Sequence, residues 1–118
     1  MRELLIYGSG GFAREVAWLA EESGRKVIGF IDDQPEKIGQ VVNNIPVLDF
    51  ERAKAYAPGV PLVIAVGSPQ IRERLYLRAR EAGFFFDTLI HPRVERSRFI
   101  EIGEGTVITA GNILTVNI

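Results

Sequence analysis

The chain has 118 residues, of which 47% are hydrophobic and 25% charged, and these values are ordinary for one globular domain. Fourteen basic and fifteen acidic side chains leave a formal charge of −1, no basic run favours nucleic acid, and the absence of cysteine excludes disulfides and thiolate catalysis. With a single histidine and no apolar run near the ~20 residues of a membrane span, we expect a soluble cytoplasmic protein without a metal site, a nucleic-acid partner or a membrane partner.

Residues 4–16 predict a short buried strand, a glycine turn and a helix. Gly8, Gly10 and Ala13 have the Gly-x-Gly-x-x-Gly/Ala spacing, in which glycines let the backbone approach an anion that the free N–H groups of the helix face. A structural turn that binds nothing is the alternative. The candidate ligand contacts in this turn are Gly8, Ser9, Gly10, Gly11 and Phe12, the last of which could equally be a core residue.

An acidic residue follows the second predicted strand, residues 27–31, where the dinucleotide-binding pattern places a carboxylate that hydrogen-bonds a ribose. Asp32 occupies this position and Asp33 follows it, as a second candidate contact or as a solvated loop carboxylate. Ligands of open α/β sheets bind outside the carboxyl ends of the strands. We therefore expect Gly10, Gly11 and Asp32 to meet at one edge of the sheet.

The next segments predict further alternation of strands and helices. Residues 45–48 form a short extended segment, and Asp49 is the predicted N-cap of a helix that runs to about Ala57. The continuous aliphatic run at 62–66 is typical of a central parallel strand. Gly67 and Ser68 follow it as candidate ligand contacts at the same edge, although capping of the next helix alone would explain Ser68.

The helix after Ser68 has an apolar stripe at Ile71, Leu75, Ala79 and Ala82 and is expected to end at Gly83. Arg72 lies in its first turn and is a candidate to orient a phosphate or a loop carboxylate. Residues 84–90 predict one more strand. Strands that alternate with helices in this way predict an α/β fold, a Rossmann-like parallel sheet flanked by helices.

The pattern changes after residue 90. Ile102, Ile108 and Leu114 recur every six positions, a period that is typical of a β-helix. We therefore divide the chain into a nucleotide-binding domain at 1–90 and a linker with a first, incomplete hexapeptide-repeat coil at 91–118. His91 is interpreted as a turn residue between them, and the aliphatic tail predicts weak self-association.

Several motifs in this order resemble one family of enzymes, the sialic-acid O-acetyltransferases and nucleotide-sugar N-acetyltransferases of the NeuD and PglD type. The motifs that carry the resemblance lie at 7–16, 29–33, 45–48, 64–67, 89–92 and 102–105. The resemblance implies a Rossmann-like domain followed by a left-handed β-helix, a homotrimer, and acetyl transfer from acetyl-CoA to a sugar amine or hydroxyl. It implies nucleotide-sugar contacts at Gly10, Gly11, Phe12, Asp32 and Asp33.

Two features limit what the resemblance implies. Bacillosamine-pathway members carry Ser-Gly-His where this chain has Gly10-Gly11-Phe12, so the nucleotide and the sugar are left open, as is the choice between N- and O-acetylation. The catalytic histidine of the family lies further along the β-helix, and no residue of this sequence matches it. We therefore expect a truncated chain that binds substrate but does not transfer acetyl groups by itself.

A different function class stays open beside this one. A stand-alone NAD(H)- or nucleotide-sensing module would share Gly8, Gly10 and Asp32. It would have no use for hexapeptide repeats after residue 100, and these repeats favour the acetyltransferase interpretation.

Overall fold

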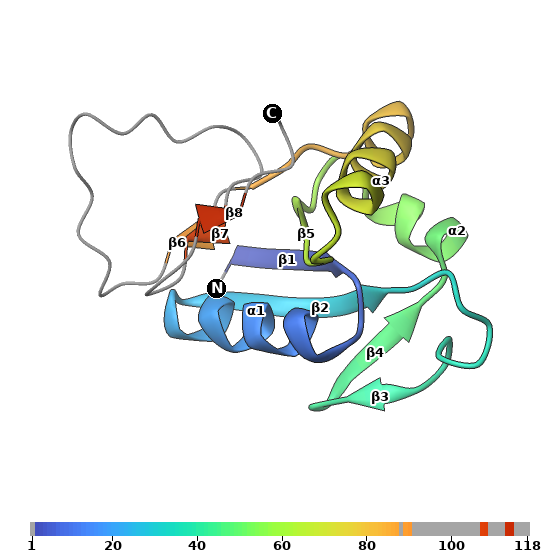
Figure 1. Ribbon diagram of the computed structural model, residues 1–118. Coiled ribbons are helices and arrows are strands. Elements are labelled where there is room, and N and C mark those ends of the chain that lie inside the picture. The colour runs from blue at the N-terminus through green and yellow to red at the C-terminus, as the bar shows by residue number, and fades with distance from the viewer. Residues whose placement is uncertain (1, 88, 91–106, 109–112, 115–118) are drawn as a thin grey trace, which may run out of the picture.

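The computed structural model describes residues 2–87, 89–90, 107–108 and 113–114 (Figure 1). Its main element is a five-stranded sheet in the order β3-β4-β2-β1-β5. The strands are β1 (Arg2–Tyr7), β2 (Arg25–Ile31), β3 (Val41–Val42), β4 (Ile45–Leu48) and β5 (Leu62–Ile64). β1 pairs in parallel with β2 and β5, and β2 pairs in parallel with β4, so the Rossmann-like prediction is confirmed.

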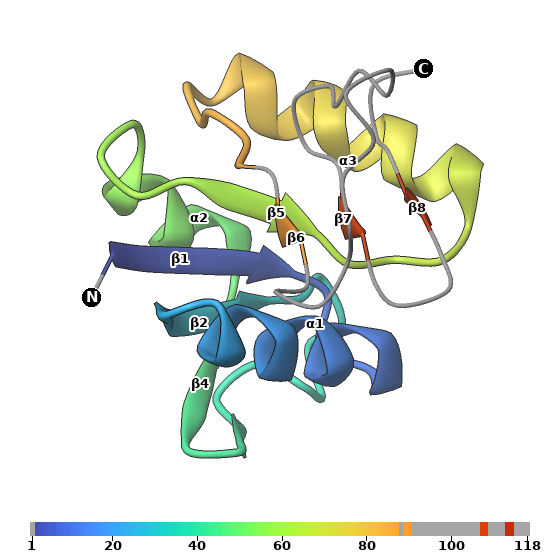
Figure 2. The same ribbon diagram turned by 90° about the vertical axis from the view of Figure 1, so that its left-hand side faces the viewer.

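The strand order creates a reversal beside β1. From β1 the chain moves outward to β2 and β4, and it then returns to place β5 on the other side of β1 (Figure 2). In sheets of this kind, ligands bind at the carboxyl ends of the strands where the order reverses. The carboxyl ends of β1, β2 and β5 therefore define the edge at which a site is expected.

Helices cover both faces of the sheet. α1 (Gly11–Glu22) packs on one face, and α2 (Phe50–Ala53) and α3 (Pro69–Glu81) pack on the other (Figure 1). β1 serves both cores, because successive side chains of a strand point to opposite faces. Leu4 and Ile6 join the cluster under α1, whereas Leu5 and Tyr7 join the cluster under α2 and α3. The continuous apolar run of β1 is what a strand buried on two faces requires.

The predicted helix ends agree with the structure except in the second helix. Gly24 has a φ of +78° just after α1, as a left-handed helix end requires. Asp49 caps α2 by accepting a hydrogen bond from the Arg52 N–H at 2.7 Å. The helix predicted to reach Ala57 is shorter, since α2 gives way to a 3₁₀ turn, η1 (Lys54–Tyr56). Ala57 is extended because the residue before a proline avoids the helical region.

The sheet is mixed at one edge, which the sequence analysis did not predict. β3 is antiparallel to β4, and Asn43 and Asn44 join them with φ values of 52° and 65°. Asparagine tolerates this left-handed conformation, which a two-residue hairpin turn requires. The pair Asn-Asn was the available signal, but two-residue strands are too short for a periodic pattern.

The single strand predicted at 84–90 is wrong. The backbone of Phe86 forms an isolated parallel bridge with Leu62, outside any strand. β6 (Leu89–Ile90) instead pairs with β7 (Val107–Ile108), which pairs with β8 (Ile113–Leu114). The rest of the predicted linker and β-helix coil at 91–118 lies outside the described residues. In the described part of the chain, no helix combines the length and hydropathy that crossing a membrane would require.

Candidate functional site

A cavity of about 390 Å³ opens at the carboxyl edge of β1, β2 and β5, within the size range of small-molecule sites. Four segments form its walls: the glycine turn after β1, the loop after β2, the turn after β5, and one side of α3. The lining residues are Tyr7, Gly8, Ser9, Gly10, Gly11, Phe12, Ala13, Ile31, Asp32, Asp33, Gln34, Lys37, Ala65, Val66, Gly67, Ile71, Arg74 and Leu75. We call this cavity the crevice.

The three glycines of the turn differ in whether the packing of the protein requires a glycine at their position. Gly8 has a φ of +121°, and a Cβ there would lie 2.7 Å from the carbonyl oxygen of Ala65, so packing against the end of β5 requires glycine. A Cβ at Gly10 would meet nothing within 4 Å, and one at Gly11 would meet only the flexible Arg14 side chain at 3.7 Å. Packing does not require glycine at these two positions. Their lack of side chains leaves the backbone open to the crevice.

The first turn of α1 borders the crevice, and its backbone N–H groups have no hydrogen-bond partner within the helix. Gly10 is the N-cap and offers no side-chain cap, and the first helical hydrogen bond runs from the Arg14 N–H to the Gly10 carbonyl oxygen at 3.1 Å. The N–H groups of the preceding residues in a first turn have no partner within the helix. Together with the positive end of the helix dipole, they favour an anion at this wall of the crevice.

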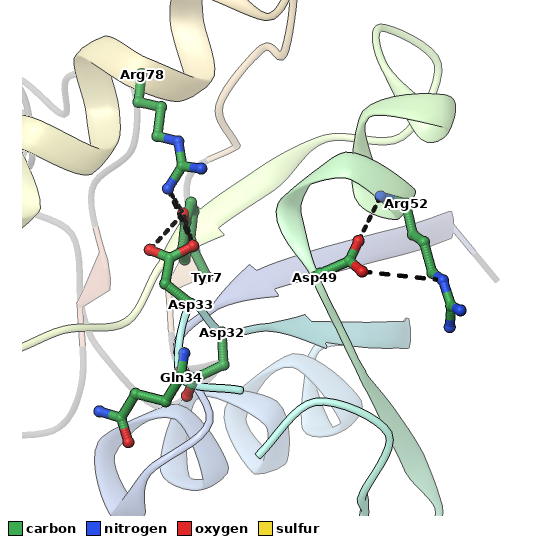
Figure 3. A network of polar contacts seen from close by, with 7 residues as sticks. All are labelled: Tyr7, Asp32, Asp33, Gln34, Asp49, Arg52 and Arg78. Carbon is green, nitrogen blue, oxygen red and sulfur yellow. Dashed lines mark hydrogen bonds and ion pairs between the residues drawn. The ribbon is translucent and has the colours of Figure 1, made fainter. Parts of the chain in front are cut away.

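The Asp32 carboxylate is held in place by two donors. The Ser9 hydroxyl donates to Oδ2. The N–H of Gln34, which lies beside Asp32 in Figure 3, donates to Oδ1 at 2.8 Å. Each carboxylate oxygen can accept a further hydrogen bond. Asp32 has no ion pair with any described residue. It can therefore accept hydrogen bonds from hydroxyl groups of a ligand, while Ser9 and Gln34 keep its orientation fixed.

Asp33 points away from Asp32 and belongs to a different network (Figure 3). The Tyr7 hydroxyl donates to both of its carboxylate oxygens at 3.0 Å, and Arg78 Nη1 donates to Oδ1 at 3.0 Å and to the Tyr7 hydroxyl at 2.9 Å. Arg78 also lies over the Phe50 ring, with its Cζ 4.2 Å from the ring centroid. The negative charge of Asp33 is therefore compensated within the protein.

Tyr7 is the buried member of this network, with 2% of its surface exposed. Burial, and next the hydrogen bond to Asp33, raise the pKa of Tyr7 well above its ordinary value of about 10. The phenol is thus a proton donor throughout the neutral range. Its role is to fix the position of Asp33 at the end of β2.

The other three candidate contacts predicted from the sequence do not all lie in the crevice. Gly67 lines the crevice, whereas Ser68 and Arg72 are not among its lining residues. The Ser68 hydroxyl caps α3 by accepting a hydrogen bond from the Ile71 N–H at 3.4 Å. Arg72 is 8% exposed, and its Nη1 donates to the carbonyl oxygens of Val66 and Gly67 at 3.5 and 3.2 Å. Arg72 thus braces the turn after β5 from inside the protein.

Two basic residues of the crevice were missed in the sequence analysis, Lys37 and Arg74. Residues three and four apart share a helix face, so Arg74 lies on the same face as Ile71, which also shares a face with Leu75. Those two were assigned to a buried stripe, but Ile71 is 37% exposed because its end of the helix borders the crevice. Helical spacing from Ile71 was the signal for Arg74. For Lys37, the only signal in the sequence was the general expectation that loops after strands line a site.

A second cavity of about 410 Å³ lies at the opposite edge, near the amino ends of β1 and β2. Its buried cation, Arg25, forms an ion pair with Asp87 and also donates to the carbonyl oxygens of Arg2 and Glu3. Arg25 is only 4% exposed and is fully committed to these partners. The charge there is structural. In the described residues, no group of three side chains is arranged to hold a metal ion.

Comparison with known proteins shows the family of the chain. Residues 3–79 match the protein family described as the PglD N-terminal domain. The chain belongs to the PglD N-terminal domain family. This match covers the whole crevice, from the glycine turn to α3, and it confirms the resemblance to the N-terminal part of NeuD/PglD-type acetyltransferases.

Relatives of this PglD N-terminal domain are sugar acetyltransferases. A UDP-N-acetylbacillosamine N-acetyltransferase of Bacillus subtilis is 32% identical over 113 residues, which are 93% of this chain and 52% of the relative. A mutant perosamine N-acetyltransferase of Caulobacter crescentus, in complex with CoA and GDP-perosamine, superposes with a TM-score of 0.81 at 29% identity and covers 94% of this chain and 53% of that one. The acetyltransferase domain of PglB from Neisseria gonorrhoeae, in complex with acetyl coenzyme A, gives a TM-score of 0.75 at 32% identity and covers 90% and 52%. The chain spans about half the length of these relatives.

Proposed function

We propose that this chain is the nucleotide-sugar-binding part of an acetyl-CoA-dependent sugar acetyltransferase. The observation that carries the proposal is the crevice itself, in which exposed glycine backbone and helix N–H groups face an oriented, unpaired carboxylate. Such a site offers donors to a phosphate and an acceptor to a hydroxyl. A nucleotide contains both groups in one molecule.

In this proposal each crevice residue has a distinct role. The N–H groups at Gly10 and Gly11 bind phosphate, and Asp32 accepts hydrogen bonds from a ligand hydroxyl. Ser9 holds Asp32 in position. Phe12 gives an apolar wall, since it packs partly buried against the core beside the crevice. Asp33 shapes the edge of the site but is already paired with Arg78, so we assign it no direct contact with the ligand.

The complete protein would then transfer the acetyl group of acetyl-CoA to an amine or hydroxyl of a nucleotide-linked sugar, with release of CoA. We propose acetyl-CoA as a co-substrate and a homotrimer as the assembly, in the cytoplasm, following the family resemblance. The CoA and GDP-perosamine named for the Caulobacter complex support the pairing of these two ligand classes. The glycine turn and Asp32 are assigned to the nucleotide sugar.

Titration calorimetry of the 118-residue chain with UDP- and GDP-linked amino sugars and with NAD⁺ tests the proposal. We expect at least one nucleotide sugar to bind more tightly than NAD⁺. Tighter binding of NAD⁺ would overturn the proposal and favour a nucleotide-sensing module.

A matched pair of variants shows whether the binding occurs in the crevice. Asp32 and Asp49 each accept a hydrogen bond from a backbone N–H, at 2.8 and 2.7 Å, but Asp49 is not a crevice residue (Figure 3). Asp32→Ala should weaken nucleotide-sugar binding and Asp49→Ala should not. Equal affinities of the two variants would contradict the assignment of Asp32.

A further inference from the structure

We propose that Lys37 and Arg74 bind the diphosphate of the nucleotide sugar and make the crevice select nucleoside diphosphates over monophosphates. This proposal rests on the proposed function above. Lys37 comes from the loop after β2 and Arg74 from α3, and both line the crevice together with the glycine turn. Two cations on two separate elements match two linked phosphate groups.

Lys37 and Arg74 differ from the neighbouring cations in having no internal partner. Neither side chain makes a hydrogen bond or an ion pair with another described residue. Arg78 is paired with Asp33 and stacked on Phe50, and Arg72 is buried against carbonyl oxygens. Among the lining residues that the structure describes, Lys37 and Arg74 are therefore the cations available to a ligand.

The charge balance of the crevice supports an anionic ligand. Its lining holds two carboxylates, Asp32 and Asp33, and two cations, Lys37 and Arg74. Arg78, which is not a lining residue, compensates Asp33. One unpaired carboxylate then faces two unpaired cations, for a balance of +1, and the positive end of α1 adds to it.

Both backbones are held in place, so the two side chains need little ordering of the chain to reach a ligand. In the loop of Lys37, its N–H donates to the Gln34 carbonyl oxygen at 3.0 Å, and its own carbonyl oxygen accepts from the Gln40 N–H at 3.2 Å. The Gly39 N–H donates a hydrogen bond to the Val47 carbonyl oxygen at 3.0 Å, which connects the loop to β4. Arg74 lies within α3, whose start is capped by a serine and a proline.

The test is the affinity of the full chain for UDP, UMP, GDP and GMP, measured by calorimetry for Lys37→Gln, Arg74→Gln and the double variant. Each single variant should lose roughly tenfold or more of the diphosphate affinity, as expected for a lost charge-assisted hydrogen bond, and much less of the monophosphate affinity. Arg74→Lys should retain part of the affinity because it keeps the charge. Raising the ionic strength should weaken diphosphate binding by wild type more than by the double variant.

Lys26→Gln and Arg80→Gln are the matched controls, since both residues are exposed and neither lines the crevice. Glutamine and arginine have similar helix propensities, so the variants at Arg74 and Arg80 should keep α3 folded. Circular dichroism checks the fold of every variant. A diphosphate-to-monophosphate affinity ratio that stays at the wild-type value in the double variant would overturn this proposal alone. Failure of folded wild type to bind any nucleotide or nucleotide sugar would overturn the proposed function as well.

Discussion

Replacing Gly11 by valine separates binding from folding in the turn after β1. A Cβ at this position would have as its nearest neighbour Arg14 Nη2, at 3.7 Å, which is the end of an exposed and flexible side chain. Position 11 begins α1, where valine is no worse a helix former than glycine. We therefore expect the free energy of unfolding to change by less than about 1 kcal/mol.

The same substitution should remove nucleotide binding. The branched side chain would stand where the phosphate approaches the backbone, so the hydrogen bonds from the first-turn N–H groups would be lost. A hydrogen bond to a charged group contributes about 1.5 to 3 kcal/mol, and the loss of two would weaken binding by roughly 100-fold or more.

Calorimetry with a nucleotide sugar and urea denaturation measure the two effects on the same protein. Gly59→Val is the control, because a Cβ there would also be free, with the Tyr56 carbonyl oxygen at 3.8 Å as its nearest neighbour, and Gly59 does not line the crevice. If folded Gly11→Val binds the ligand with wild-type affinity, the turn has no contact with phosphate and the reasoning is refuted.

Three further substitutions have separate expected outcomes. Asp32→Ala should cost about 1 to 3 kcal/mol of nucleotide-sugar binding by calorimetry, and an unchanged affinity would mean that the carboxylate only orders its loop. Gly8→Ala should lower the free energy of unfolding in urea by about 2 kcal/mol or more, because it combines a strained φ with a contact at 2.7 Å from the Ala65 carbonyl oxygen, and wild-type stability would contradict this. The folded-state pKa of Tyr7 is raised, so its contribution to stability is present below pH of about 10 and is lost as the pH rises above that value. Urea denaturation at several alkaline pH values should therefore show a steeper loss of stability for wild type than for Tyr7→Phe, and parallel curves would disprove the assignment.

Local patterns were sufficient to predict the frame of the site. The aliphatic run that ends at Tyr7, the glycine spacing and the carboxylate after β2 each depend on neighbouring residues and on general rules of parallel sheets. They placed Gly10, Gly11 and Asp32 at one edge, where the structure has them. The caps at Asp49 and Ser68 are likewise short-range features, and both were predicted.

The direction of individual side chains could not be predicted in the same way. A shift of two positions turns a helix by about 200°. Arg72, the predicted contact, therefore lies on the buried side of α3, whereas Arg74 lies on the crevice side. The role of Asp33 depends on Arg78, which lies 45 positions away and meets it only in the folded protein. No local pattern contains that contact. Side-chain pairing across elements is therefore what the sequence left undetermined.

Amide chemical-shift mapping with a nucleotide sugar tests the central claim most directly, because it reports where on the chain the ligand binds. We predict that the largest shifts fall on the amides of Gly10, Gly11 and Phe12 and on those of residues 32–34, around the crevice. Shifts centred instead on Arg25 and Asp87, at the cavity on the opposite edge of the sheet, would contradict the account.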